Sequence, residues 1–109
     1  MTFSQRISRL GEIFGALDCT CFHHWRTGQN PPYVIWYETS TPSFESDNGS
    51  TETGMEGYVH LFTQDDADPI ADSIIEAMQA AGMTFTFQGS NYEEDTNLVH
   101  MYWSWAWLS

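Results

Sequence analysis

Residues 98–108 read LVHMYWSWAWL, and apolar side chains recur along this stretch at every second position. One set of alternate positions holds Val99, Met101, Trp103, Trp105 and Trp107. Because successive side chains of a strand point to opposite faces of a sheet, this spacing predicts a β-strand. The other set is also largely apolar or aromatic, which does not suit an exposed edge. We therefore expect a central strand, with helices over one face and a further layer, such as another subunit, over the other.

The rest of the chain divides into two helices and three further strands. Apolar residues at three- and four-residue steps predict a helix over residues 3–17, with Phe3, Ile7, Leu10, Phe14 and Leu17 on its buried stripe. A second helix is expected to start at Asp68 and Pro69 and to end at Gly82. Strands are expected at residues 33–38, 54–63 and 83–88, while residues 18–29 read as irregular and residues 39–53 as a long polar loop.

This order predicts an α+β fold, a single domain over residues 1–109 with the sequence α-β-β-α-β-β. The expected sheet has four strands and is mostly antiparallel, because no crossover helix separates the first two strands and a short hairpin connection joins the last two. We place the fourth strand between the second and the third, and both helices on one face of the sheet.

The chain is strongly acidic, with 15 Asp and Glu against 3 Lys and Arg in 109 residues and a formal net charge of -12. Such a surface repels nucleic acid and anionic membranes. It fits solubility or a salty host, and equally a surface that avoids or imitates DNA. No apolar run is long enough to span a bilayer, and the N-terminal residues lack the apolar core of a signal peptide, so we expect synthesis in the cytoplasm.

One cluster holds the soft metal ligands of the chain: Cys19, Cys21, His23 and His24. Thiolates and imidazoles bind zinc, but structural zinc sites usually bring together two ligand pairs separated by a loop. All four residues here lie within one short segment. We therefore expect a partly buried turn with reduced cysteines and no bound metal, and keep a small metal-binding module as an alternative.

Other catalytic patterns are missing from the sequence. It has no G-x-S-x-G nucleophile elbow and no glycine-rich phosphate loop. The paired carboxylates Asp65-Asp66 and Glu93-Glu94 lie at a helix start and in a hairpin connection, where solvated charge is the usual role. We therefore expect a protein that is not an enzyme and needs no cofactor.

The pattern from Pro32 onward resembles a known family. It consists of PYVIWYE, a polar loop with Ser43-Phe44 and Asp47-Asn48, then GYVHLFTQDDADPIADSIIEAM, an aromatic strand, and an acidic connection into LVHMYWSWAW. This order resembles the tail-terminator and tail-completion (head–tail joining) proteins of long-tailed bacteriophages, over roughly residues 30–107. The resemblance rests on the order of elements and on a degenerate pattern.

The resemblance implies a structural virion protein made in the host cytoplasm. It would form a ring, typically a hexamer, that caps the tail tube and meets the head–tail connector, while DNA passes through without specific binding. The expected contact residues are Phe44, Asp47, Asn48, Trp103, Trp105 and Trp107. Phe44 either reaches a partner or folds back onto the sheet. The alternative function is an acidic DNA mimic that inhibits a host DNA-binding protein.

Overall fold

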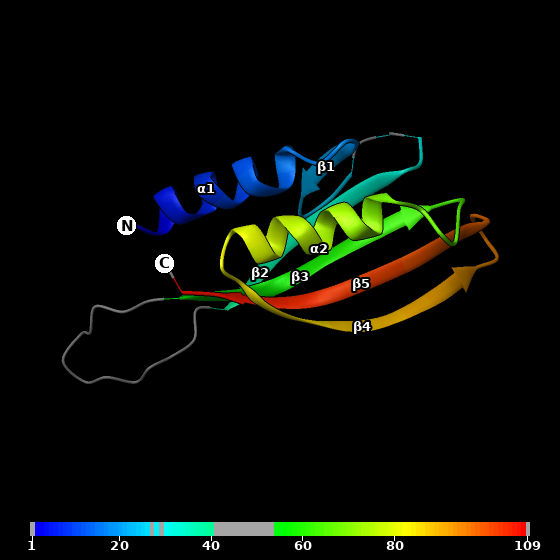
Figure 1. Ribbon diagram of the computed structural model, residues 1–109. Helices are drawn as coiled ribbons and strands as arrows, with labels where there is room; N and C mark the ends of the chain where they lie inside the picture. The colour runs from blue at the N-terminus through cyan, green and yellow to red at the C-terminus, as the bar shows by residue number, and fades with distance from the viewer. Residues whose placement is uncertain (1, 27, 29, 41–53, 109) are drawn as a thin grey trace.

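The computed structural model describes residues 2–26, 28, 30–40 and 54–108, and it has two helices and five strands in these parts of the chain (Figure 1). In chain order the elements are α1 (Phe3–Gly15), β1 (Thr20–His23), β2 (Tyr33–Ser40), β3 (Met55–Thr63), α2 (Ile70–Ala80), β4 (Thr84–Glu93) and β5 (Leu98–Trp107). None of the helices in the described ranges is long and apolar enough to cross a bilayer. The predicted α+β class is confirmed.

The sheet has the strand order β1-β2-β3-β5-β4, so the expected number of four strands is wrong. The four strands that the sequence predicted do lie in the expected order, with β5 between β3 and β4. The missed strand, β1, pairs in parallel with β2 at the sheet edge, and its four residues show no alternation of burial. A strand this short carries no usable periodicity, which explains why its segment read as irregular.

The central strand β5 follows the predicted alternation. Trp103, Trp105 and Trp107 are each at most 4 % exposed and lie in the hydrophobic core. Both helices cover this face: Phe14 of α1 packs against Trp105 at 6.2 Å between ring centroids, and Ile74 of α2 belongs to the same core. The expectation that the three tryptophans form a contact surface is therefore corrected, because the helices cover the face with the largest apolar side chains.

Helix α1 begins at a capping box, in which Thr2 accepts from the backbone N–H of Gln5 and the Gln5 side chain accepts from the backbone N–H of Thr2. The helix ends two residues before the predicted boundary. Phe3 is 54 % exposed, whereas Arg6 is buried on the face that it shares with Leu10, four residues further along. The expected buried stripe is thus wrong at Phe3.

Helix α2 begins at Ile70 with Pro69 as its N-cap residue, one residue later than predicted, whereas the predicted end at Gly82 is confirmed. The Asp68 carboxylate accepts from the backbone N–H of Ile70 at 2.9 Å, and Gly82 has the left-handed φ of 78° that favours glycine after a helix. Strand β4 runs five residues beyond its predicted end, through an irregularity in register between Phe87 and Gly89. The predicted hairpin connection is correspondingly shorter.

Candidate functional site: the uncovered face of the sheet

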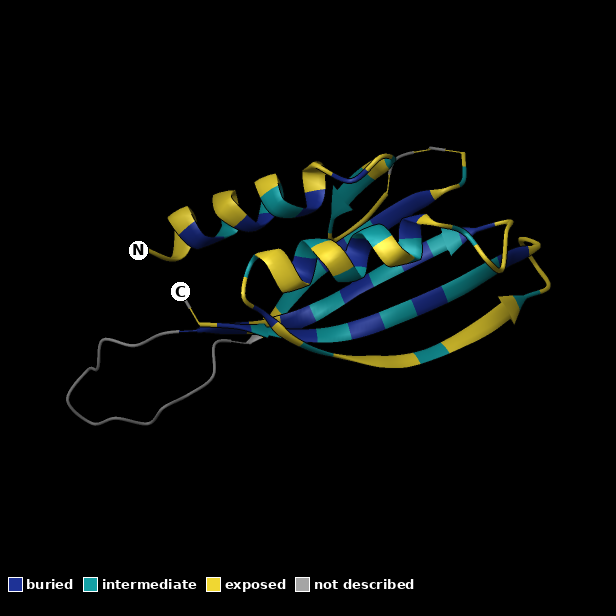
Figure 2. Cartoon of the chain, in the orientation of Figure 1, coloured by how far each residue is buried: buried dark blue, intermediate teal, exposed yellow. Residues whose placement is uncertain are grey.

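Both helices lie on the same side of the sheet, so the other face of β2, β3 and β5 has no layer over it in the described structure (Figure 1). Figure 2 shows buried and intermediate residues alternating along β3 and β5, as expected for strands with one covered face. Strand register assigns the following residues to this uncovered face: Tyr33, Ile35, Tyr37, Tyr58, His60, Phe62, His100, Tyr102 and Ser104.

None of those nine positions holds Asp, Glu, Lys or Arg, although the whole chain has a net charge of -12; the Arg26 guanidinium lies over the Tyr33 ring, 4.8 Å from its centroid. The nearest carboxylates on this side are Glu56 and Glu93, at its two ends. A face rich in aromatic residues and depleted of charge has the composition of a protein–protein interface core. Among the described residues, the carboxylates of this face are therefore confined to its two ends.

Aromatic rings on this face contact one another across the strands. The ring of Phe62 stacks on Tyr33 of β2 at 5.0 Å and on His100 of β5 at 4.3 Å between centroids. The rings of His60 and Tyr102 are nearly parallel, at 5.3 Å and 8°. Such cross-strand pairs stabilise the sheet, and they also hold the rings in fixed positions.

A chain of polar contacts crosses four strands on the same face. His60 Nε2 lies 2.9 Å from the Tyr37 hydroxyl, and His60 Nδ1 lies 2.6 Å from His100 Nε2. The chain ends at Glu93, whose Oε2 lies 3.3 Å from His100 Nδ1. Since a carboxylate only accepts, His100 donates from Nδ1 to Glu93, His60 donates from Nδ1 to His100, and Tyr37 donates to His60.

This arrangement needs both imidazoles to be neutral. Burial lowers the pKa of His60 from 6.5 to about 4, and His100 adds to the effect. Burial also lowers the pKa of His100, although the Glu93 carboxylate acts in the opposite direction. Burial, with a smaller contribution from Tyr58, raises the pKa of Tyr37. Both imidazoles are therefore neutral at neutral pH, and the one carboxylate of the chain, Glu93, lies at the end of the face.

A shallow hollow of about 280 Å³ lies at the Glu56 end of this face. Its lining includes the small polar side chains of Thr39, Thr84, Thr86 and Ser104. Glu56 supplies the one carboxylate of the lining, and no histidine or cysteine reaches it. The described residues that line the hollow therefore include no paired groups of the kind that acid–base or nucleophilic catalysis uses.

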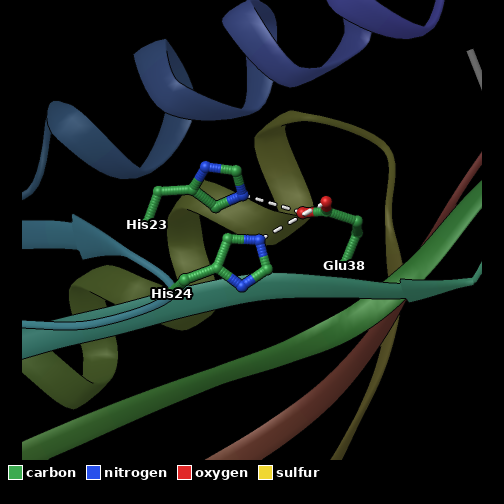
Figure 3. A group of neighbouring side chains, drawn as sticks. All are labelled: His23, His24 and Glu38. Atoms are coloured by element: carbon green, nitrogen blue, oxygen red, sulfur yellow. Dashed lines mark hydrogen bonds and ion pairs between the residues drawn. The ribbon is translucent and has the colours of Figure 1, made fainter.

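The cysteine and histidine cluster is split by the structure. Cys21 donates from its thiol to the Phe14 carbonyl oxygen at 3.0 Å, and its contact with Cys19 together with burial raises the pKa of Cys21. Neither cysteine belongs to the group of potential metal ligands that the described residues bring together. His23 and His24 instead face Glu38 of β2, a residue that sequence reasoning did not connect with them (Figure 3).

The loop residues expected to make contacts, Phe44, Asp47 and Asn48, lie outside the described residues.

The chain from Tyr37 to Glu93 was not predicted from the sequence, because only the register of four strands brings its members together. The sequence pattern that could have indicated this chain is the alternation in β5, which places His100 and Tyr102 on the face opposite the tryptophans.

Comparison of the sequence with protein-family models found no matching family, and comparison with curated proteins found no match. The function therefore has to be argued from the chain's own geometry and composition.

Proposed function

We propose that this chain is a structural subunit that buries its uncovered sheet face against a second copy of itself, in a ring that terminates the tail of a long-tailed bacteriophage. The observation that carries the assembly is the aromatic face of β2, β3 and β5, where nine neighbouring positions hold no charged residue and Glu56 and Glu93 lie at the two ends, in a protein of net charge -12. Exposed apolar patches of this kind typically mark interaction sites. The assignment to phage tails rests on the resemblance in element order.

A ring requires this face of one copy to meet a different surface of the next copy. The nine uncharged positions remove like-charge repulsion from one side of each contact between two acidic copies, and Glu56 and Glu93 lie at the rim. The remaining acidic surface of a ring would repel the phosphate backbone, so DNA passes without binding. In this proposal the further partners are the tail tube and the head–tail connector, and the protein is located in the virion.

A single charge placed in this face tests the proposal. Tyr58 contacts the rings of Tyr37, His60 and Tyr102 but forms none of the hydrogen bonds of the histidine chain, so Tyr58→Glu adds a carboxylate without removing a member of that chain. Gln79→Glu adds the same charge on the exposed side of α2 and is the matched control. We expect the wild type and the control to form a ring by light scattering and negative-stain imaging, and Tyr58→Glu to remain a folded monomer.

Two results would contradict the proposal. One is a wild type that stays monomeric at every concentration tested. The other is a ring that forms equally well with Tyr58→Glu. A monomer that binds a host DNA-binding protein tightly would favour the DNA-mimic alternative instead.

A further inference from the structure

Two imidazoles and a carboxylate meet where β1 ends beside β2. His23 Nε2 lies 2.7 Å from Glu38 Oε1, and His24 Nε2 lies 3.6 Å from Glu38 Oε2 (Figure 3). The ligand atoms of the three residues all lie within 4.8 Å of one another. We propose that His23, His24 and Glu38 bind a divalent transition-metal ion of the zinc class, and that this ion fastens the edge strand β1 to β2.

The backbone brings both histidines to one carboxylate. Adjacent residues of an extended strand point to opposite faces, so His23 and His24 would ordinarily diverge. His24 instead adopts a left-handed conformation with φ of 77°, and its backbone N–H donates to the Trp36 carbonyl oxygen at 3.0 Å. This uncommon conformation turns the second imidazole toward the first. Backbone strain of this kind is concentrated at ligand-binding positions.

Aromatic packing fixes both rings. The His23 ring stacks on Trp36 at 4.1 Å and 16°, and the His24 ring lies parallel to Tyr37 at 6.1 Å and 13°. The two imidazoles also contact each other, with 4.2 Å between their centroids. Ligands held by their surroundings lose little freedom when an ion binds, which favours binding.

The ligand set and the spacing fit zinc. Zinc forms bonds of roughly 2.0–2.1 Å to imidazole nitrogen and carboxylate oxygen in tetrahedral geometry, which places neighbouring ligand atoms about 3.3 Å apart. The 2.7 Å and 3.6 Å distances run to the two different oxygens of Glu38, and all three ligand atoms lie within 4.8 Å of one another, so the side chains must shift to bring them to this spacing around an ion. The side chains of His23 and His24 are 33 % and 42 % exposed, which leaves room for water as the fourth ligand.

Zinc titration of the full chain, after removal of metal with a chelator, tests the site by calorimetry. We expect one zinc ion per chain, and an affinity at least about tenfold weaker in both His24→Asn and Glu38→Gln, because each removes one of three protein ligands. Asparagine tolerates the left-handed conformation at position 24, so the first variant keeps the fold. Glu76→Gln, which removes an exposed carboxylate of α2, is the matched control and should bind as the wild type does.

A second titration separates this ligand set from one that uses the thiols. Cys19→Ser should bind zinc normally, and the cobalt form of the wild type should show no sulfur-to-metal charge-transfer absorption. The inference is overturned if the wild type does not bind zinc, if both ligand variants bind it unchanged, or if Cys19→Ser abolishes binding. None of these results depends on whether the chain forms a ring.

Discussion

Acid should weaken the fold through His60, and the size of the effect follows from its surroundings. The pKa of His60 is about 4 in the folded chain against an ordinary value of 6.5, because burial disfavours the charged imidazole. The unfolded chain therefore binds more protons between these two values. The stabilising contribution is complete above about pH 6.5 and is lost as the pH falls toward about 4.

The pKa difference sets an upper limit of roughly 3.4 kcal/mol, at about 1.4 kcal/mol per pKa unit. His60 is only half-buried, so solvent screening reduces this to about 1–2 kcal/mol. Protonation of Nε2 reverses its hydrogen bond with Tyr37, because the hydroxyl oxygen can accept from the protonated ring. The expected loss therefore originates in the burial of a charged imidazole beside His100.

Urea unfolding at a series of pH values measures this contribution, with His60→Gln as the reference protein. Glutamine still forms hydrogen bonds but does not titrate, so the difference between the two proteins isolates His60. Acid also relieves the repulsion within a chain of net charge -12, but this effect is common to both proteins. From about pH 7.5 to about pH 4.5 we expect the wild type to lose about 1–2 kcal/mol relative to His60→Gln. A difference that stays constant over this range would refute the reasoning.

Two further predictions concern the core and are read from urea midpoints. Gly57→Ala should cost about 1–3 kcal/mol, because a methyl group there meets the main chain of β2 and comes within 2.7 Å of the Trp105 ring. Gly15→Ala, which has no atom within 4 Å, is the control and should be neutral or stabilising; equal costs would contradict this packing. Trp107→Phe should cost about 1 kcal/mol more than Trp105→Phe. The Trp107 N–H donates to the Ala81 carbonyl oxygen, whereas the Trp105 N–H has no acceptor among the described residues; the opposite order would contradict the assignment.

The sequence predicted those parts of the fold that local patterns encode. Alternation in β5 identified a central strand, and Asp68 and Gly82 marked the two ends of α2. The choice of contact face failed because both faces of β5 are apolar. Which of them the helices cover depends on packing between segments far apart in the chain, and they cover the face with the larger tryptophan side chains.

Strand β1 and the group formed by His23, His24 and Glu38 could not be predicted from local sequence patterns either. His23 and His24 were recognised as potential ligands, but their partner lies fifteen residues after His23, on a strand whose parallel register cannot be read from local spacing. That register sets His23 opposite Trp36, and Glu38 follows on the same face two residues further along β2. A long-range pairing, and the left-handed backbone of His24, therefore decide which residue completes the group.

The four histidines form two pairs whose surroundings give them different chemistry. Both ring nitrogens of His60, and both of His100, are used within the chain that joins Tyr37 to Glu93, so no nitrogen is left for an ion. His23 and His24 direct only Nε2 toward Glu38, and both nitrogens converge on the one carboxylate. The first pair is therefore a neutral part of the sheet face, and in the proposed assembly a charge there would disrupt packing against a second copy. The second pair lies at the sheet edge, where a bound cation would compensate charge in an acidic protein and would fasten its shortest strand.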